Sequence, residues 1–110
     1  MIATYRKRLF EGETVANTSI TSKIFDLDTN KGFSIELNVT GAGCAGSAIV
    51  EGSNDGANWV TITGGTATIA GPDSIVFNCP EYYVSMARLV VTSSNLNTMT
   101  LNAFGLAKSY

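Results

Sequence analysis

Few side chains in this sequence have the types and the spacing that catalysis needs. The 110 residues include no histidine, so a triad with an imidazole base, the common zinc ligand sets and a proton shuttle near neutral pH all lack their usual member. The nine acidic residues fall on expected turns or on the polar sides of expected strands, where nothing in the sequence raises a carboxyl pKa. We therefore expect a protein that is not an enzyme and that uses no cofactor and no small-molecule substrate.

One acidic stretch, from Asp26 to Gly32, spaces oxygen-bearing side chains two residues apart, as a calcium-binding loop does. A helix–loop–helix calcium loop also needs glycine at its sixth position and glutamate at its twelfth, and Lys31 and Leu37 stand there instead. The stretch is better interpreted as a β-turn in which Gly32 takes a positive φ. We expect no metal site here.

The basic residues gather in one place, where Arg6, Lys7 and Arg8 supply three of the seven positive charges. In an extended strand Arg6 and Arg8 would share one face and Lys7 would take the other. One interpretation is an edge strand whose charges prevent pairing with other chains. The alternative is an extended N-terminal arm, residues 1–12, that contacts a neighbouring subunit or nucleic acid. Because the net charge is −2, we do not expect nucleic acid to be the partner.

The elements that hold these side chains are predicted to be strands. Apolar residues make up 45% of the chain and charged residues 15%, and apolar and polar residues alternate with the period of two that a half-buried strand requires. The clearest run places its apolar residues on one face: Phe33, Ile35, Leu37 and Val39. Strands are predicted at residues 5–11, 23–28, 33–40, 47–52, 59–63, 66–70, 74–78, 82–92 and 98–108.

Turn residues separate these segments every 8 to 12 residues or so, as in antiparallel sandwiches. We predict an all-β fold, a single antiparallel β-sandwich of about eight or nine strands, jelly-roll-like or Ig-like, in one domain over residues 1–110. No apolar run approaches the ~20 residues that span a bilayer, and no export signal is evident. We expect no membrane span, synthesis in the cytoplasm and reduced thiols at Cys44 and Cys79, although the sequence leaves open whether they pair.

The segment EGSNDGANWVTI, residues 51–62, is the most distinctive stretch of the chain. Its centre carries residues that tolerate left-handed backbone and whose side chains bond to nearby backbone groups. A tight β-hairpin is therefore predicted. We expect this turn to anchor the fold through Ser53, Asn54, Asp55, Gly56 and Trp59.

Trp59, the single tryptophan, has two possible tasks. As the first residue of the returning strand its ring is expected to cover Val50 or Ile49 across the hairpin. The alternative is an exposed platform that stacks on a sugar ring, with Tyr82 and Tyr83 as further platforms.

The late strand at residues 82–92 is apolar on both sides near its end, which favours a central position in a sheet. Arg88 interrupts its apolar character. An arginine in such a strand is expected to lie at a mouth of the sandwich or to pair with a carboxylate such as Glu36 or Glu51.

These motifs resemble two known families. The run VEGSNDGANW, residues 50–59, is similar to a hairpin of the discoidin, or coagulation-factor C-type, carbohydrate-binding modules. Over nearly its whole length the chain resembles a group of short β-sandwich proteins that bacteriophages carry as virion components. That second resemblance covers the strand at 32–37, the hairpin, the late strand at 82–91 and a closing strand that ends near a lysine.

The phage resemblance implies a non-enzymatic structural protein, located in the virion, of the head-decoration, vertex or tail-attachment type. It would assemble as a homo-oligomer and dock on the major capsid protein or another virion protein. The alternative is a carbohydrate- or surface-binding adhesion module for host recognition, as the discoidin-like hairpin and Trp59 would suggest.

Overall fold

The alternation of apolar and polar residues appears directly in the burial of the strands. The computed structural model describes residues 3–27, 32–79 and 84–109. In its strand at Gly32–Thr40 the predicted apolar face is buried, whereas exposed and half-buried residues alternate with it. The strand at Met99–Ser109 likewise buries Met99, Leu101 and Ala103 and leaves Phe104 exposed. Period two therefore sets which side chains enter the core.

Nine strands lie in the described residues, and their bounds are β1 (Ala3–Val15), β2 (Ser19–Thr21), β3 (Phe25–Asp26), β4 (Gly32–Thr40), β5 (Ala45–Ser53), β6 (Val60–Ala70), β7 (Asp73–Cys79), β8 (Met86–Ser93) and β9 (Met99–Ser109).

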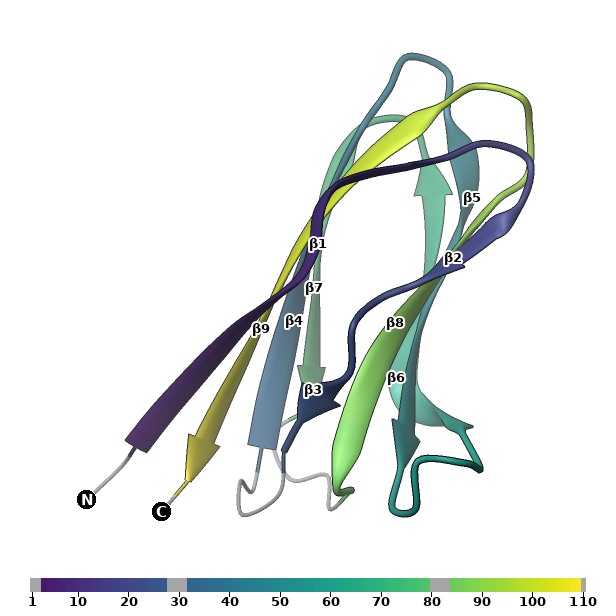
Figure 1. Ribbon diagram of the computed structural model, residues 1–110. Helices are drawn as coiled ribbons and strands as arrows, with labels where there is room; N and C mark the ends of the chain where they lie inside the picture. The colour runs from purple at the N-terminus through teal and green to yellow at the C-terminus, as the bar shows by residue number, and fades with distance from the viewer. Residues whose placement is uncertain (1–2, 28–31, 80–83, 110) are drawn as a thin grey trace.

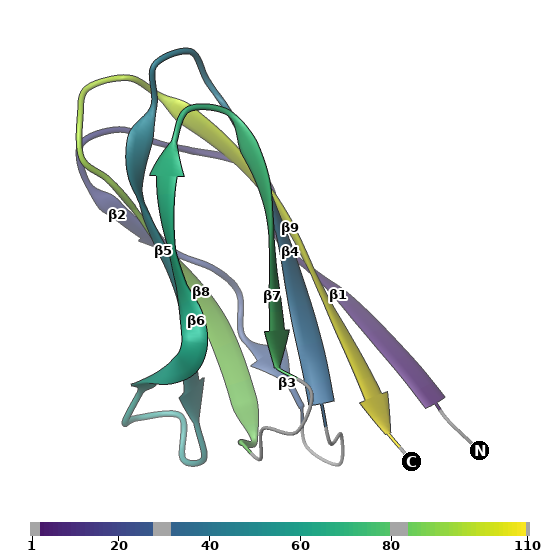
Figure 2. The ribbon, with the colours of Figure 1, turned by 180° about the vertical axis from the view of Figure 1, so that it is seen from behind.

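The strands form two antiparallel sheets that pack face to face (Figures 1 and 2). One sheet has the order β1-β9-β4-β7, and the other has the order β2-β8-β5-β6, with β3 also pairing with β8. If β2 and β3 are taken as one interrupted strand, this order is that of two interleaved Greek keys, which defines a jelly roll. The predicted all-β sandwich is confirmed, and of its two variants the jelly roll is the one observed.

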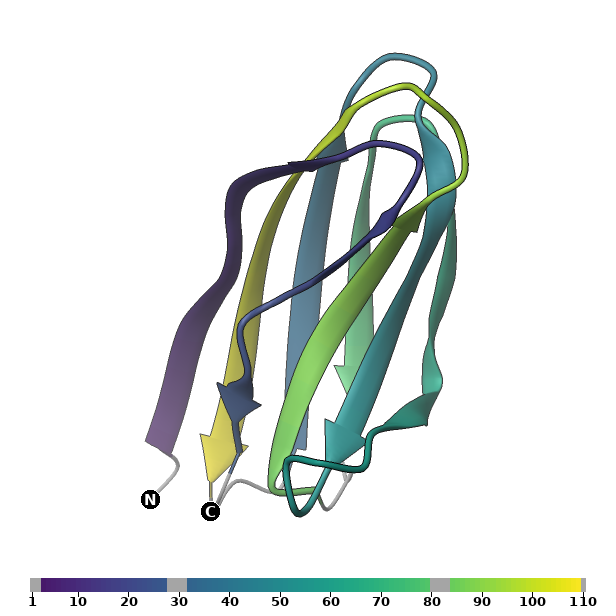
Figure 3. The same cartoon turned by 45° about the vertical axis from the view of Figure 1, so that its right-hand side comes forward.

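The two ends of the sandwich carry different connections (Figure 3). Residues 16–18, 41–44, 71–72 and 94–98 join strands at one end. The β5–β6 hairpin lies at the other end, where β1 begins and β9 finishes side by side (Figure 1). The hairpin and the basic residues of β1 are thus positioned by different sheets.

Two of the predicted strand boundaries were wrong around glycine. Segments 59–63 and 66–70 form the single strand β6, because Gly64 and Gly65 make a bulge and not a turn. On β5 one residue separates Ile49 from Glu51, while their partners Thr66 and Thr61 are five positions apart. Gly64 takes a φ of 79° within this bulge, a conformation that glycine adopts without strain.

The predicted strand at 23–28 was too long, because among its described residues, 23–27, only Phe25–Asp26 is extended and paired. The strand β2 was not predicted. Ser22 interrupts the pairing with β8. Its backbone N–H donates to the carbonyl of Leu89 at 2.8 Å, but its hydroxyl, and not its carbonyl, accepts the Leu89 N–H at 2.8 Å. A side chain that replaces a backbone acceptor ends the regular ladder at this point.

The late strand begins at Met86 and not at residue 82, and Tyr82 and Tyr83 lie outside the described residues. So do positions 28–31 of the turn predicted after Asp26. β8 does take the predicted interior position, between β2 and β5.

Both cysteines are buried and free. Burial also raises the pKa of the Cys79 thiol, which favours its protonated form. The structure thus holds both thiols unpaired in the core.

Candidate functional site

The β5–β6 hairpin is held together by two side chains. Asp55 Oδ1 accepts the backbone N–H groups of Ala57 at 2.9 Å and Asn58 at 2.8 Å, while its Oδ2 accepts the Asn58 side-chain amide at 2.8 Å. The Ser53 hydroxyl donates to Asp55 Oδ1 at 3.0 Å and accepts the Gly56 N–H at 2.9 Å. Gly56 has a φ of 78°. These polar groups of the loop thus form hydrogen bonds with one another.

Asn54 links the hairpin to the rest of the five-stranded sheet. Its Oδ1 accepts the backbone N–H of Ser85, just before β8, at 2.9 Å. The turn is therefore attached to the neighbouring connection as well as closed within itself.

The Asp55 carboxylate is expected to stabilise the fold, and this contribution should be lost when acid protonates it. Hydrogen bonds from the Asn58 and Ala57 backbone, then from the Asn58 amide and the Ser53 hydroxyl, hold the pKa of this exposed carboxyl well below its usual range. A carboxyl group whose pKa is lower in the folded state than in the unfolded state stabilises the fold. Its contribution to the free energy of unfolding is fully present at pH values above the ordinary pKa of about 3.9, and it is lost as the pH falls toward the folded-state pKa. Asp55→Asn should therefore lower the urea midpoint at about pH 7 and differ less from the parent at about pH 3. An equal difference at both pH values would contradict this assignment.

Trp59 packs on the ion pair of Arg88 and Glu51. The Arg88 guanidinium carbon lies 4.1 Å from the centroid of the indole ring, and Arg88 Nε donates to Glu51 Oε1 at 2.9 Å. The Trp59 Nε1–H donates to the carbonyl of Gly56 at 3.3 Å. Val50 is fully buried on the opposite face of β5 from Glu51.

The pairing of Arg88 with Glu51 confirms one of the two carboxylates expected from the sequence. The two residues are also directly opposite in the β5–β8 register. Their side chains are 28% and 22% exposed, so the pair is largely but not fully removed from water. One face of the indole ring thus contacts Arg88, and its N–H is hydrogen-bonded to the carbonyl of Gly56.

Removing this pair should destabilise the fold measurably. Arg88→Ala leaves the Glu51 carboxylate half-buried without its partner and uncovers the Trp59 ring, which is expected to cost about 1–3 kcal/mol. Arg88→Lys should cost less, because it keeps the charge but loses the planar stacking. Urea titrations of Arg88→Ala, Glu51→Gln and the double variant give the coupling energy. Strictly additive losses would show that the two side chains do not interact.

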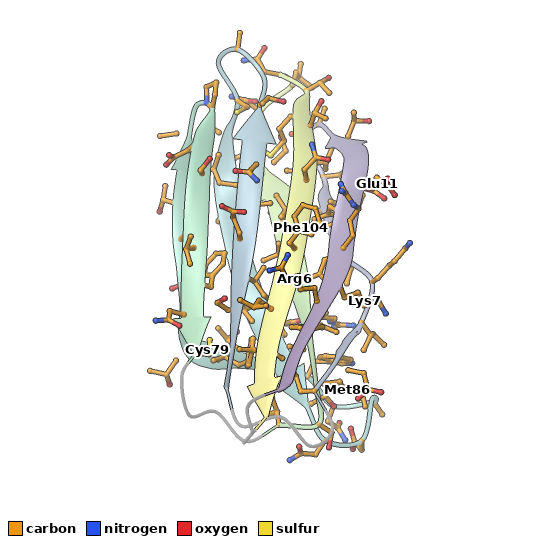
Figure 4. All side chains as sticks on the ribbon, turned by 90° about the vertical axis from the view of Figure 1, so that its left-hand side faces the viewer. Arg6, Lys7, Glu11, Cys79, Met86 and Phe104 are labelled. Carbon is orange, nitrogen blue, oxygen red and sulfur yellow. The ribbon has the colours of Figure 1, made fainter. Side chains whose placement is uncertain are left out.

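A second feature is a groove of about 620 Å³ on the outer face of the four-stranded sheet. Apolar and charged side chains line it together, and the side chains of Phe104 and Arg6 both lie over the middle of this face (Figure 4). Phe104 is 38% exposed and Val76 is 63% exposed. The lining side chains that the later argument uses are Arg6, Arg8, Glu36, Val76, Phe104 and Leu106.

The basic residues of β1 divide as expected between two faces. Arg6 and Arg8 line the groove, and the Arg8 guanidinium carbon lies 4.3 Å from the centroid of the Phe104 ring. Lys7 also borders the groove, but its Nζ donates to the carbonyl of Ile24 at 2.8 Å. β1 is an edge strand, so its charges also occupy the position at which they oppose pairing with other chains.

A smaller hollow of about 310 Å³ lies beside the hairpin, lined by Gly52, Ser53, Asn54, Asp55, Asn58, Val60 and Val84. Trp59 does not line it. Within the part of the chain that the structure describes, no group of three or more His, Cys, Asp or Glu side chains is placed to hold a metal ion. Those same residues contain no helix long and apolar enough to cross a membrane.

Comparison with known proteins identifies the fold. No protein-family model and no curated protein sequence matches the chain. The SPBc2 prophage-derived protein YomS matches with a TM-score of 0.65 at 9% identity, covering 99% of this chain and 96% of YomS. The chain has the jelly-roll β-sandwich fold.

Two further solved structures share this fold. The VP2 protein of an infectious bursal disease virus subviral particle matches with a TM-score of 0.69 at 12% identity, over 99% of this chain and 33% of that protein. A Bacillus endospore appendage protein, from a family of disulfide-linked pili, matches with a TM-score of 0.62 at 13% identity, over 99% of this chain and 89% of that one. At such low identities these likenesses establish the fold alone.

The groove was not predicted from the sequence. Its members Phe104, Leu106, Val76 and Glu36 come from three strands that are far apart in the sequence. A signal was present, because Phe104 stands in the polar phase of its strand, together with Thr100 and Asn102. A large aromatic residue in that phase indicates an exposed apolar surface.

Proposed function

We propose that this protein is a non-enzymatic structural component of a bacteriophage virion, which acts by self-assembly and by docking on a capsid or other virion protein. The observation that carries the proposal is a groove, lined by apolar and charged side chains, on the open face of a jelly roll. An aromatic centre with a polar rim is the pattern of protein–protein interfaces. The whole-chain likeness to a prophage-derived protein and to a protein of a viral particle supports the phage setting.

The test is to locate the protein after particles form. Particles from the strain that carries the gene would be purified on a density gradient and analysed by mass spectrometry. We expect the chain to co-purify with the particles in many copies per particle. Recovery of the chain only from the soluble fraction of the lysate would overturn the proposal.

A second candidate function is a carbohydrate- or surface-binding adhesion module. It is favoured by one observation, the hollow of about 310 Å³ next to the hairpin that carries Trp59. A glycan array combined with Trp59 fluorescence separates the two functions. A shift in emission on addition of sugar supports adhesion, and an unchanged spectrum with no bound glycan supports the structural role.

A further inference from the structure

The strand register aligns four side chains in one row across the groove. Arg8 pairs with Phe104, Phe104 pairs with Glu36 and Glu36 pairs with Val76. Neighbouring strands lie about 4.8 Å apart, so β1 and β4, which carry Arg8 and Glu36, flank β9 at similar distances on its two sides. Residues of opposite charge thus stand on the two strands next to the partly exposed Phe104.

These two charges do not pair with each other within the chain. Arg8 lies over the Phe104 ring and 4.0 Å from Glu11. Glu36 is exposed, and it has no ion pair with any residue that the structure describes. The groove therefore presents a cation on β1 and a carboxylate on β4 that has no cationic partner among those residues.

The adjacent row repeats the arrangement. Arg6 on β1 pairs with Leu106 on β9, which pairs with Ser34 on β4. Both rows place an arginine on β1, an apolar side chain on β9 and a hydrogen-bonding side chain on β4. The apolar line therefore runs along β9.

We propose that this face is the interface of a two-fold homodimer whose symmetry axis runs along β9, an inference that rests on the self-assembly in the proposed function. A rotation of 180° about that axis places β1 of one copy over β4 of the other. Phe104 and Leu106 then meet their own copies on the axis. Arg8 faces the partner's Glu36, and the same contact occurs twice, as an isologous interface requires.

Other positions of the axis are less favourable. An axis along β4 places Glu36 on its own copy, which brings two like charges together. An axis between β9 and β4 places Phe104 over the partner's Glu36 and leaves that carboxylate without a cation. Of these three positions, the axis along β9 gives the best charge complementarity.

The size of the face agrees with a second copy as the occupant. The molecule measures 44 × 27 × 21 Å, so a sheet face can supply the ~800 Å² per partner that a stable interface buries. Two such sheets would stack about 10 Å apart with their strands roughly aligned. The partner's Phe104 and Leu106 would then fill the groove.

The test uses charge reversal and mixing. Sedimentation velocity over a wide range of concentrations should show that the parent chain is a dimer. Arg8→Glu and Glu36→Arg should each raise the dimer dissociation constant by about 100-fold or more, because each places like charges in both contacts. An equimolar mixture of the two single variants should recover the dimer as a heterodimer. In it the two introduced charges face each other in one contact, and the unchanged Arg8 and Glu36 face each other in the second.

Thr68→Arg, on the exposed side of the other sheet, is the matched control and should leave the dimer unchanged. Circular dichroism of each variant shows whether it is folded, and the mixture test remains decisive because an unfolded variant cannot rescue its partner. A parent chain that is monomeric throughout, or a dimer indifferent to both reversals, would overturn this interface. Neither result would decide the proposed function, because that proposal is tested separately by co-purification of the chain with particles.

Discussion

We expect the Gly46→Ala variant to lose at least about 3 kcal/mol of unfolding free energy. A Cβ at position 46 would stand 1.8 Å from the carbonyl oxygen of Thr92 and 2.9 Å from its carbonyl carbon. Both atoms belong to the backbone of β8, in which Ser93 pairs with Gly46. No side-chain rotation relieves such an overlap, so β5 and β8 must separate. Urea unfolding followed by Trp59 fluorescence measures the loss.

Gly64→Ala is the matched control in the same sheet. No atom lies within 4 Å of the added Cβ, so this change should cost only the ~1–2 kcal/mol of a left-handed backbone at a non-glycine residue. If Gly46→Ala costs no more than Gly64→Ala, the close approach of β5 and β8 is not what restricts position 46.

Phe25→Ala is expected to cost about 3–5 kcal/mol, the usual loss for truncating a buried aromatic side chain. Phe25 is fully buried, although β3 has only two residues. Its ring meets that of Phe33 edge to face, with centroids 6.4 Å apart. It also lies against Gly105, where an added Cβ would come within 2.6 Å of the ring. Thermal and urea unfolding provide the measurement.

The contact with Gly105 gives this prediction an internal check. Gly105→Ala should destabilise the parent protein, because its Cβ overlaps the buried ring. The same change should cost much less in the Phe25→Ala background, where the space is free. Such non-additivity is expected of residues in direct contact, and additive losses would contradict the packing.

The parts of the fold that follow from local pattern could be predicted from the sequence. The alternation in residues 33–40 identified the buried face of β4. The residues 53–56 identified the one hairpin within a sheet among the described strands, although its connection, residues 54–59, is longer than the tight turn predicted. Arg88 was expected to need a carboxylate and has Glu51 opposite to it. Each of these inferences depends on neighbours in sequence or on the cost of an unpaired buried charge.

The remainder depends on contacts between distant segments. Glycines 64 and 65 have the composition of a turn, yet the strand continues through them because β5 offers partners on both sides of the bulge. The groove exists only because the registers of β1, β9, β4 and β7 bring Arg8, Phe104, Glu36 and Val76 into one row. Register between strands far apart in the chain is not encoded in any single stretch of residues.

The central position of β9 in its sheet affects how the chain folds. β9 is the last of the nine described strands to be synthesised, yet it lies between β1 and β4. β1, the first of the described strands to be synthesised, therefore has no neighbour in its sheet until β9 has been made. Such non-local pairing makes folding slow, and the four-stranded sheet can be completed only after β9 has emerged. Until then β1 and β4 lack their common neighbour, and the newly made chain depends on the charges of β1 to discourage pairing with other chains.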